Sequence, residues 1–163
     1  CRLPSIDGKA KMSKSLGNCI YLSDEPKEIE RKVMSMFTDP NHIKVSDPGM
    51  VEGNPVFLYL DAFCEPEDFS RFLPEYSSLQ ELKEHYQRGG LGDIKVKRFL
   101  SQVLQSRLQP IYQRRKEWEQ RLPEVYEMLY QGSMAARERA EQTLEAVRHA
   151  MKIDYFTQNS LLQ

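Results

Sequence analysis

Two lysines and two serines stand close together near the start of the chain, in the order Lys11-Met12-Ser13-Lys14-Ser15. Each ammonium group carries a compact positive charge with three donors, and the two hydroxyls can donate as well. Gly8 and Gly17 bracket the segment, and glycine adopts backbone angles that other residues avoid. A loop of this kind can close over a ligand and meet charge that develops on phosphate oxygens. These residues therefore predict a loop that clamps a polyphosphate.

The five residues alone also fit an ordinary basic surface loop, because lysine and serine are common in such loops. The rest of the sequence adds a second basic feature. The net charge is only -1, but residues 93–121 hold eight Lys or Arg against three acids, whereas residues 61–86 hold seven acids against two bases. This segregation favours a phosphate-rich partner for the basic stretch.

The three cysteines, Cys1, Cys19 and Cys64, are odd in number and far apart, with no Cys-x-x-Cys pair and no histidine cluster. They predict reduced thiols and no metal site. No apolar run approaches the ~20 residues that a membrane-spanning helix needs, and no leader segment is visible. We expect a cytoplasmic protein that does not enter the membrane. Because the sequence starts without Met, we also expect a fragment of a longer protein.

The hydrophobic pattern is helical over most of the chain. Apolar residues recur at helical spacing over 25–37, and Asn54 with Pro55 predicts the start of a helix that ends near residue 64. Ser78 caps the next helix, which stops at Gly89, and Asp93 opens a long helix with Pro110 inside it. One apolar face is expected along this long helix, made by Val96, Phe99, Leu100, Val103, Leu104, Ile111 and Trp118. Two more helices are expected over 123–131 and 133–151, the second capped by Ser133. A short strand is expected over 19–22.

The 163 residues are enough for one domain with a core, or one domain and part of another. The fold class predicted is all-α: a helical bundle over 24–152, preceded over 1–23 by the loop and the short strand. Residues 153–163 show no period and predict a disordered tail.

The five-residue word is the KMSKS signature of class I aminoacyl-tRNA synthetases, and the resemblance extends well beyond it. Four stretches are similar to bacterial tryptophanyl members of that family. They are DGKAKMSKSLGN over 7–18, VMSMFTDPNHIKVSDPG over 33–49, VEGNPVFLYLDAF over 51–63 and LKEHYQRGGLGDIKVK over 82–97. With the final helices, the resemblance reaches about residue 151.

The resemblance implies an enzyme that joins tryptophan to ATP, with Mg²⁺, and passes the aminoacyl group to tRNA(Trp). Lys11 and Lys14 would be the catalytic residues, and Met12, Ser13 and Ser15 would complete the ATP-binding segment. The helical part would be the anticodon-binding domain, and residues 1–23 the edge of a Rossmann-like catalytic domain. The family works as homodimers. Because no His-x-Gly-His motif occurs here, we expect the nucleotide-binding half to be missing and the fragment alone to be inactive.

The basic long helix is the candidate tRNA-binding element, since neutralising RNA phosphates needs Lys and Arg side chains. Two alternatives stay open at this point. One is another class I synthetase such as the tyrosine enzyme, because a phosphate loop does not choose the amino acid. The other is a non-catalytic tRNA-binding module that retains the loop. The candidate tRNA contacts are Lys95, Lys97, Arg98, Arg107 and Arg114.

Overall fold

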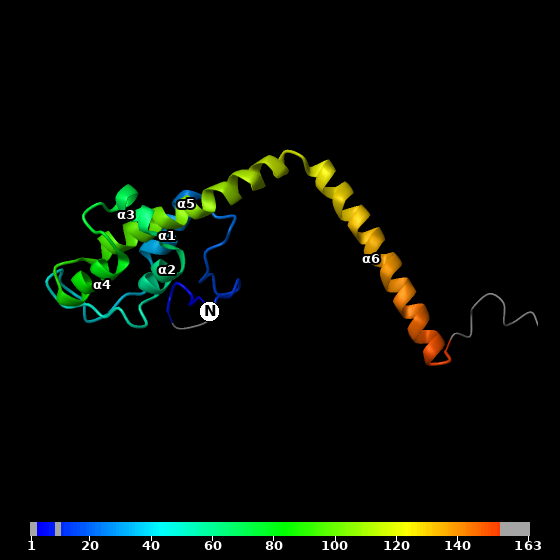
Figure 1. Cartoon of the computed structure of the whole chain (residues 1–163), viewed down its shortest axis with the longest axis horizontal. Helices are drawn as coiled ribbons and strands as arrows, with labels where there is room; N and C mark the ends of the chain where they lie inside the picture. The colour runs from blue at the N-terminus through cyan, green and yellow to red at the C-terminus, as the bar shows by residue number, and fades with distance from the viewer. Residues whose placement is uncertain (1–2, 9–10, 154–163) are drawn as a thin grey trace, which may run out of the picture. The chain divides into compact units, whose positions relative to one another are not determined.

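The computed structural model describes residues 3–8 and 11–153, and within them the chain is all-helical, with no strand (Figure 1). By its internal contacts the chain divides into two compact units, Cys1–Arg115 and Lys116–Gln163, and the boundary falls within α5. In the described part of the chain, no helix has the length and apolar character needed to cross a membrane. The described residues form six helices: α1 (Pro26–Met34), α2 (Pro55–Phe63), α3 (Pro66–Phe72), α4 (Leu79–Arg88), α5 (Asp93–Glu119) and α6 (Leu122–Ala150).

The segment 19–22, expected as a strand, is irregular instead, and this prediction was wrong. A strand needs a neighbour that pairs with its backbone groups. Here the amide of Tyr21 donates to the Asp24 carboxylate at 2.8 Å, which turns the chain into α1. The helix itself ends at Met34, earlier than the expected residue 37.

The starts of α2 and α4 confirm the capping residues read from the sequence. The side chain of Asn54 accepts a hydrogen bond from the amide of Val56 at 3.0 Å. Ser78 accepts from the amide of Glu81 at 3.2 Å. Since these bonds satisfy amides that a helix leaves unpaired in its first turn, they fix where each helix begins.

Helix α3 was missed by the sequence analysis. It has only seven residues, and its first amides follow Glu65, a residue type that the capping rule does not favour. The carboxylate of Asp68 accepts a hydrogen bond from the amide of Glu65 at 2.8 Å. Pro66 at the first helical position, with an acid two residues later, was the available signal.

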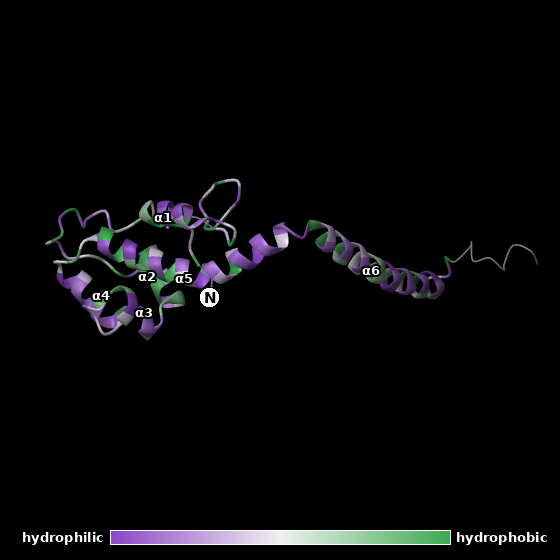
Figure 2. Cartoon of the chain, turned by 90° about the horizontal axis from the view of Figure 1, so that it is seen from above, coloured by the Kyte–Doolittle hydropathy of each residue, from purple (hydrophilic) through white to green (hydrophobic). Residues whose placement is uncertain are grey.

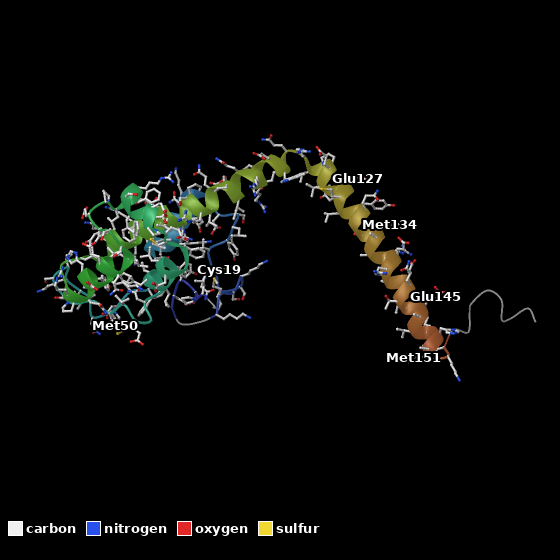
Figure 3. All side chains as sticks on the ribbon, in the orientation of Figure 1. Cys19, Met50, Glu127, Met134, Glu145 and Met151 are labelled. Carbon is white, nitrogen blue, oxygen red and sulfur yellow. The ribbon has the colours of Figure 1, made fainter. Side chains whose placement is uncertain are left out.

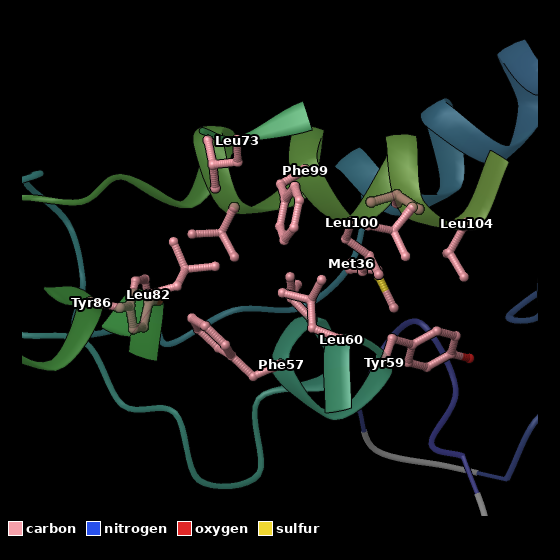
Figure 4. Packing of buried hydrophobic residues seen from close by; sticks show 14 of the residues in the cluster. Met36, Phe57, Tyr59, Leu60, Leu73, Leu82, Tyr86, Phe99, Leu100 and Leu104 are labelled. Atoms are coloured by element: carbon pink, nitrogen blue, oxygen red, sulfur yellow. The ribbon is translucent and has the colours of Figure 1, made fainter. Parts of the chain in front are cut away.

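One hydrophobic cluster contains residues from each of the five helices α1, α2, α3, α4 and α5 (Figure 4). Phe57 of α2 and Tyr86 of α4 lie with ring centroids 4.9 Å apart, and Phe69 of α3 lies 4.8 Å from Phe99 of α5. Such tilted ring pairs add about 0.5–1.5 kcal/mol beyond the burial of their area. The cluster confirms the apolar face expected for the first half of the long helix, made by Val96, Phe99, Leu100, Val103 and Leu104.

The same face was expected to stay buried further along α5, and there the prediction was wrong. Ile111 is 43 % exposed and Trp118 is 41 % exposed. The guanidinium of Arg121 lies over the Trp118 ring, 4.6 Å from its centroid. Helical spacing says which residues share a face, but burial also needs an element to pack against that face.

Helix α6 is continuous, so the two helices expected over 123–131 and 133–151 are one. Ser133, expected as a cap, lies in its interior. Over Leu122–Ala150, all of which the structure describes, no residue is buried. Figure 2 shows apolar and polar residues alternating along α6, and the labelled side chains of Glu127, Met134 and Glu145 mark its course in Figure 3. The expected tail lies outside the described residues except for Ile153.

Candidate functional site

The candidate site is the segment 11–17, which we call the clamp loop. Gly8 precedes it and Gly17 is its last residue, with φ of +67° and +62°, values in the left-handed region that favours glycine. A Cβ atom added to Gly8 would come within 3.0 Å of Pro55 Cγ and 3.3 Å of Phe37 Cδ1. The chain therefore needs glycine at Gly8 both for its backbone angle and for its close approach to the helical part.

A buried asparagine holds the base of the clamp loop. Asn18 is 5 % exposed, and its side-chain oxygen accepts a hydrogen bond from the amide of Ser13 at 2.8 Å. Its side-chain nitrogen donates to the Asp7 carboxylate at 3.3 Å, and its backbone oxygen accepts from the amide of Ile6 at 3.1 Å. Buried polar groups that are satisfied in this way specify one geometry.

Two further contacts tie the loop to its surroundings. The hydroxyl of Tyr59, on α2, donates to the backbone oxygen of Pro4 at 2.8 Å and lies 3.7 Å from Met12 Sδ. Burial raises the pKa of Tyr59 above its ordinary value, so this hydroxyl keeps its proton further into the alkaline range. The thiol of Cys19, a buried residue labelled in Figure 3, lies 3.8 Å from the backbone oxygen of Ser13.

The two lysines of the loop lie in solvent. Lys11 and Lys14 are both exposed, and neither ammonium group forms a hydrogen bond or ion pair with any residue that the structure describes. The hydroxyls of Ser13 and Ser15 lie 2.9 Å apart. The clamp loop thus presents two positive charges that pair with no described residue, and a pair of hydroxyls, on a base that is fixed by hydrogen bonds. This set of donors is suited to phosphate oxygens.

Sequence reasoning named the residues that carry the charge and missed those that hold the loop in place. Asp7, Asn18 and Tyr59 belong to stretches that the resemblance already covered, yet nothing in their spacing says that they meet. Among the described residues no group of three or more His, Cys, Asp or Glu side chains could hold a metal ion.

Three of the five candidate tRNA contacts on α5 are engaged within the fold. Lys97 is 9 % exposed, and its ammonium group donates to the backbone oxygens of Met34 at 3.1 Å and Met36 at 2.6 Å. Burial lowers its pKa. We therefore correct the placement of Lys97, which ties α5 to the end of α1 and is not a surface group. Lys95 pairs with Glu75.

Arg107 is also paired, because its guanidinium donates to the buried carboxylate of Asp68 at 2.6 Å and to the backbone oxygen of Phe63 at 3.3 Å. Arg98 and Arg114 are exposed, and neither has a hydrogen-bond or ion-pair partner in the part of the chain that the structure describes. With 3.6 residues per turn they lie on nearly opposite sides of α5. The structure does not bring the five side chains together into one patch.

Comparison with known proteins gives close relatives of this chain. It is 58 % identical over 155 residues to the tryptophan–tRNA ligase of Clostridium longisporum. The matched region covers 95 % of this chain and 43 % of that protein. The chain is 54 % identical over 155 residues to the tryptophan–tRNA ligase of Streptococcus pyogenes serotype M3, spanning 95 % of this chain and 44 % of that protein. The chain therefore spans less than half the length of these relatives.

The fold also matches a solved structure. The crystal structure of tryptophanyl-tRNA synthetase from Campylobacter jejuni superposes with a TM-score of 0.73 at 22 % identity, over 93 % of this chain and 45 % of that one. A second structure of that enzyme, complexed with ADP and tryptophan, gives the same TM-score at 23 % identity. The family model described as tRNA synthetases class I (W and Y) matches residues 2–109. The chain, with its KMSKS word on an anchored loop, belongs to the class I tRNA synthetases of the tryptophan and tyrosine group.

Proposed function

We propose that this chain is the C-terminal portion of a tryptophan–tRNA ligase, and that it contributes the clamp loop and the helices that bind the anticodon arm of tRNA(Trp). The observation that carries the proposal is the pair of exposed ammonium groups of Lys11 and Lys14, which pair with no described residue and stand on a loop with a fixed base. The identity to ligases named for tryptophan supports tryptophan over tyrosine as the amino acid.

In the proposed reaction a carboxylate oxygen of tryptophan forms a bond to the α-phosphorus of ATP, and the bond from that phosphorus to the bridging oxygen breaks. Pyrophosphate leaves with the electron pair of the broken bond. Lys11 and Lys14 stabilise the negative charge that shifts onto the leaving oxygens, because their charge and donors are in place before the reaction. Ser13 and Ser15 donate to the same phosphates, and Met12 anchors the loop through Tyr59.

Mg²⁺ belongs to the proposal as a companion of ATP. Phosphate oxygens are hard ligands that Mg²⁺ prefers, so the ion would arrive with the triphosphate and share its charge with the two lysines. The resemblance also leads us to propose a homodimer for the complete ligase.

The proposal is tested by building this chain into a complete enzyme. The matching segment of the Clostridium longisporum ligase is replaced by this chain, and tryptophan-dependent exchange between ATP and pyrophosphate is measured against the unaltered ligase. We expect exchange within about tenfold of the unaltered enzyme. A folded chimera without exchange would support the non-catalytic module instead.

The choice of tRNA separates the tryptophan assignment from the tyrosine alternative. We expect the chain to bind a tRNA(Trp) transcript more tightly than a tRNA(Tyr) transcript, with affinity that falls steeply as salt rises, because phosphate contacts release counterions. Tighter binding of tRNA(Tyr) would favour the tyrosine enzyme.

A further inference from the structure

A small pocket of about 130 Å³ lies between the start of α1 and the middle of α5. Ile29, 2 % exposed, belongs to the core and lines the pocket together with Pro26 and Leu108. This volume is far below the ~300 Å³ at which sites for drug-sized ligands begin. It suits one planar ring held against an apolar wall.

The remaining lining residues are polar, and several of their atoms are unused. The side chain of Gln109 forms no hydrogen bond with any described residue. The amide nitrogen of Gln105 donates to Ser101 Oγ at 2.9 Å, and the amide oxygen of Gln105 has no partner within residues 3–8 and 11–153. The pocket thus offers both donors and acceptors of the amide type.

The carboxylate of Asp24 adds a further acceptor. Its Oδ2 accepts from Lys32 Nζ at 2.6 Å and from the amide of Tyr21 at 2.8 Å, while its Oδ1 is bonded to no described residue. Because the ion pair with Lys32 offsets the charge, a nearby phosphate is repelled less than by a lone carboxylate. The aromatic ring in the pocket belongs to Tyr112, whose hydroxyl lies 3.4 Å from Glu25 Oε1.

This combination matches the chemistry of a nucleobase. Unpaired bases are bound by stacking on aromatic rings and by hydrogen bonds to their edges. Amide side chains bond a base edge with one donor and one acceptor, and carboxylates accept from the exocyclic amino group of cytosine. A base with an exocyclic amino group would satisfy both Asp24 and Gln109, whereas a keto group in its place would face the carboxylate with a second acceptor.

One charge beside the pocket favours a base within a strand. Arg98 is exposed and has no described partner. It precedes Gln105 by seven residues, which is about two turns, so it lies on the same face of α5 roughly 10 Å away. A guanidinium at this position can bind a phosphate of the strand that carries the base.

We propose that this pocket binds a single unpaired nucleobase of the tRNA, one that carries an exocyclic amino group, with Tyr112 as the stacking surface and Gln109 and Asp24 as the groups that read its edge. The inference rests on the proposed function, since it names where the bound tRNA contacts the helical part. It assigns base recognition to the α1–α5 pocket, and only Arg98 of the five residues first considered lies beside it.

The test measures the dissociation constant of the chain for a tRNA(Trp) transcript, with the Gln109→Leu variant and with transcripts in which each anticodon nucleotide in turn is abasic. We expect Gln109→Leu to weaken binding about tenfold or more. One abasic position should cause a similar loss, and combining the two changes should add little, because both remove the same contact. Gln87→Leu, an exposed substitution on α4, is the matched control and should leave binding unchanged.

Each outcome decides between named alternatives. Failure of the unaltered chain to bind tRNA would contradict the proposed function and the pocket together. If the chain binds tRNA while Gln109→Leu binds as tightly as Gln87→Leu, the pocket assignment is overturned and the function stands. The same holds if Gln109→Leu weakens binding to every abasic transcript as much as to the intact one. If free ATP binding weakens in Gln109→Leu while tRNA binding does not, the pocket takes a free nucleotide and the inference is again overturned. The abasic arm needs no protein variant, so it does not depend on how the variants fold.

Discussion

Two irregular segments of the first unit are both rich in polar residues but differ in how they are held. The clamp loop, residues 11–17, has an anchored base and exposed lysines. The second segment, residues 38–53, which we call the docked loop, buries the polar side chains of Asp39 and His42 in the fold. The carboxylate of Asp39, 8 % exposed, accepts from the amides of Asn41 and Met50 at 2.9 Å each. His42 Nδ1 lies 3.1 Å from Asp93 Oδ1.

Backbone hydrogen bonds also join the docked loop to α4 and to the residues that follow this helix. The amide of Gly49 donates to the backbone oxygen of Tyr86 at 2.9 Å, and the amide of Gly90 donates to that of Val45 at 2.7 Å. The comparison teaches that the presence of turn-forming residues does not predict whether the side chains of a loop are held in the fold or exposed to solvent. A loop whose buried carboxylate is satisfied inside the fold is a structural part, whereas ammonium groups on a fixed base that pair with no described residue are available to a ligand.

The largest expected effect on stability follows from packing in the docked loop. A Cβ atom at Gly49 would lie 2.3 Å from Cε1 of Tyr86, which is fully buried and hydrogen-bonded to Asp93. We expect Gly49→Ala to lower the free energy of unfolding by about 3 kcal/mol, the upper range for overpacking. Urea denaturation followed by circular dichroism measures it.

The matched change in the clamp loop is Gly17→Asn. No described atom lies within 4 Å of a Cβ at Gly17, and asparagine tolerates its left-handed angle, so the loss should stay below about 1 kcal/mol. Equal losses in the two variants would contradict the distinction between the loops.

A smaller loss is expected when the docked loop keeps its shape but loses an acceptor. Asp39→Ala removes two hydrogen bonds that the amides of Asn41 and Met50 donate to a buried carboxylate, which costs about 2 kcal/mol at roughly 1 kcal/mol for each bond. Lys14→Ala, at an exposed position of the clamp loop, should change stability by less than about 0.5 kcal/mol. Thermal unfolding of both variants at one pH measures the two losses of stability. If Lys14→Ala loses as much stability as Asp39→Ala, the distinction between the loops is contradicted.

The smallest effect is a change of stability with pH. We assign this change to the half-buried Cys64 thiol and not to the lysines of the clamp loop. Burial, with a contribution from the charge of Asp68, raises the pKa of the Cys64 thiol from 9.0 to about 11. The folded protein therefore holds this proton at pH values where the unfolded chain has released it. The stability that the thiol contributes is present below pH 9 and is lost as pH rises toward 11.

Unfolding measured between pH 8 and 11 should show this loss in the unaltered chain and a flatter profile in Cys64→Ala. The variant Lys11→Ala with Lys14→Ala should keep the profile of the unaltered chain. If the pH profile of stability changes in the double lysine variant and stays the same in Cys64→Ala, the assignment is contradicted.

The sequence predicted what local chemistry decides. Asn54 and Ser78 were recognised as caps because a cap acts on amides two or three residues away. The clamp loop was recognised because its residues are contiguous. The spacing also predicted the core face of α5, since periodicity within one helix is a local property.

What the sequence did not reveal depends on contacts between distant segments. The sequence predicted Lys97 as a surface charge. In the structure its ammonium group donates hydrogen bonds to two backbone oxygens more than sixty residues away in the chain. Trp118 falls on an apolar stripe, but among the described residues no element covers it fully. The pairing of Asn18 with Asp7 and Ser13 needed the folded loop, because hydrogen bonds across a loop leave no period in the sequence.

The central claim is that the ammonium groups of Lys11 and Lys14 neutralise a triphosphate as it is cleaved. The most direct measurement is the rate of tryptophan-dependent ATP–pyrophosphate exchange in the chimeric ligase, with Lys14→Ala compared with Lys44→Ala, an exposed lysine of the docked loop. We expect Lys14→Ala to slow exchange by about 10²–10³-fold, the usual effect of removing one donor to developing charge, and Lys44→Ala to leave it unchanged. An unchanged rate in Lys14→Ala, and in the variant that also carries Lys11→Ala, would contradict the account.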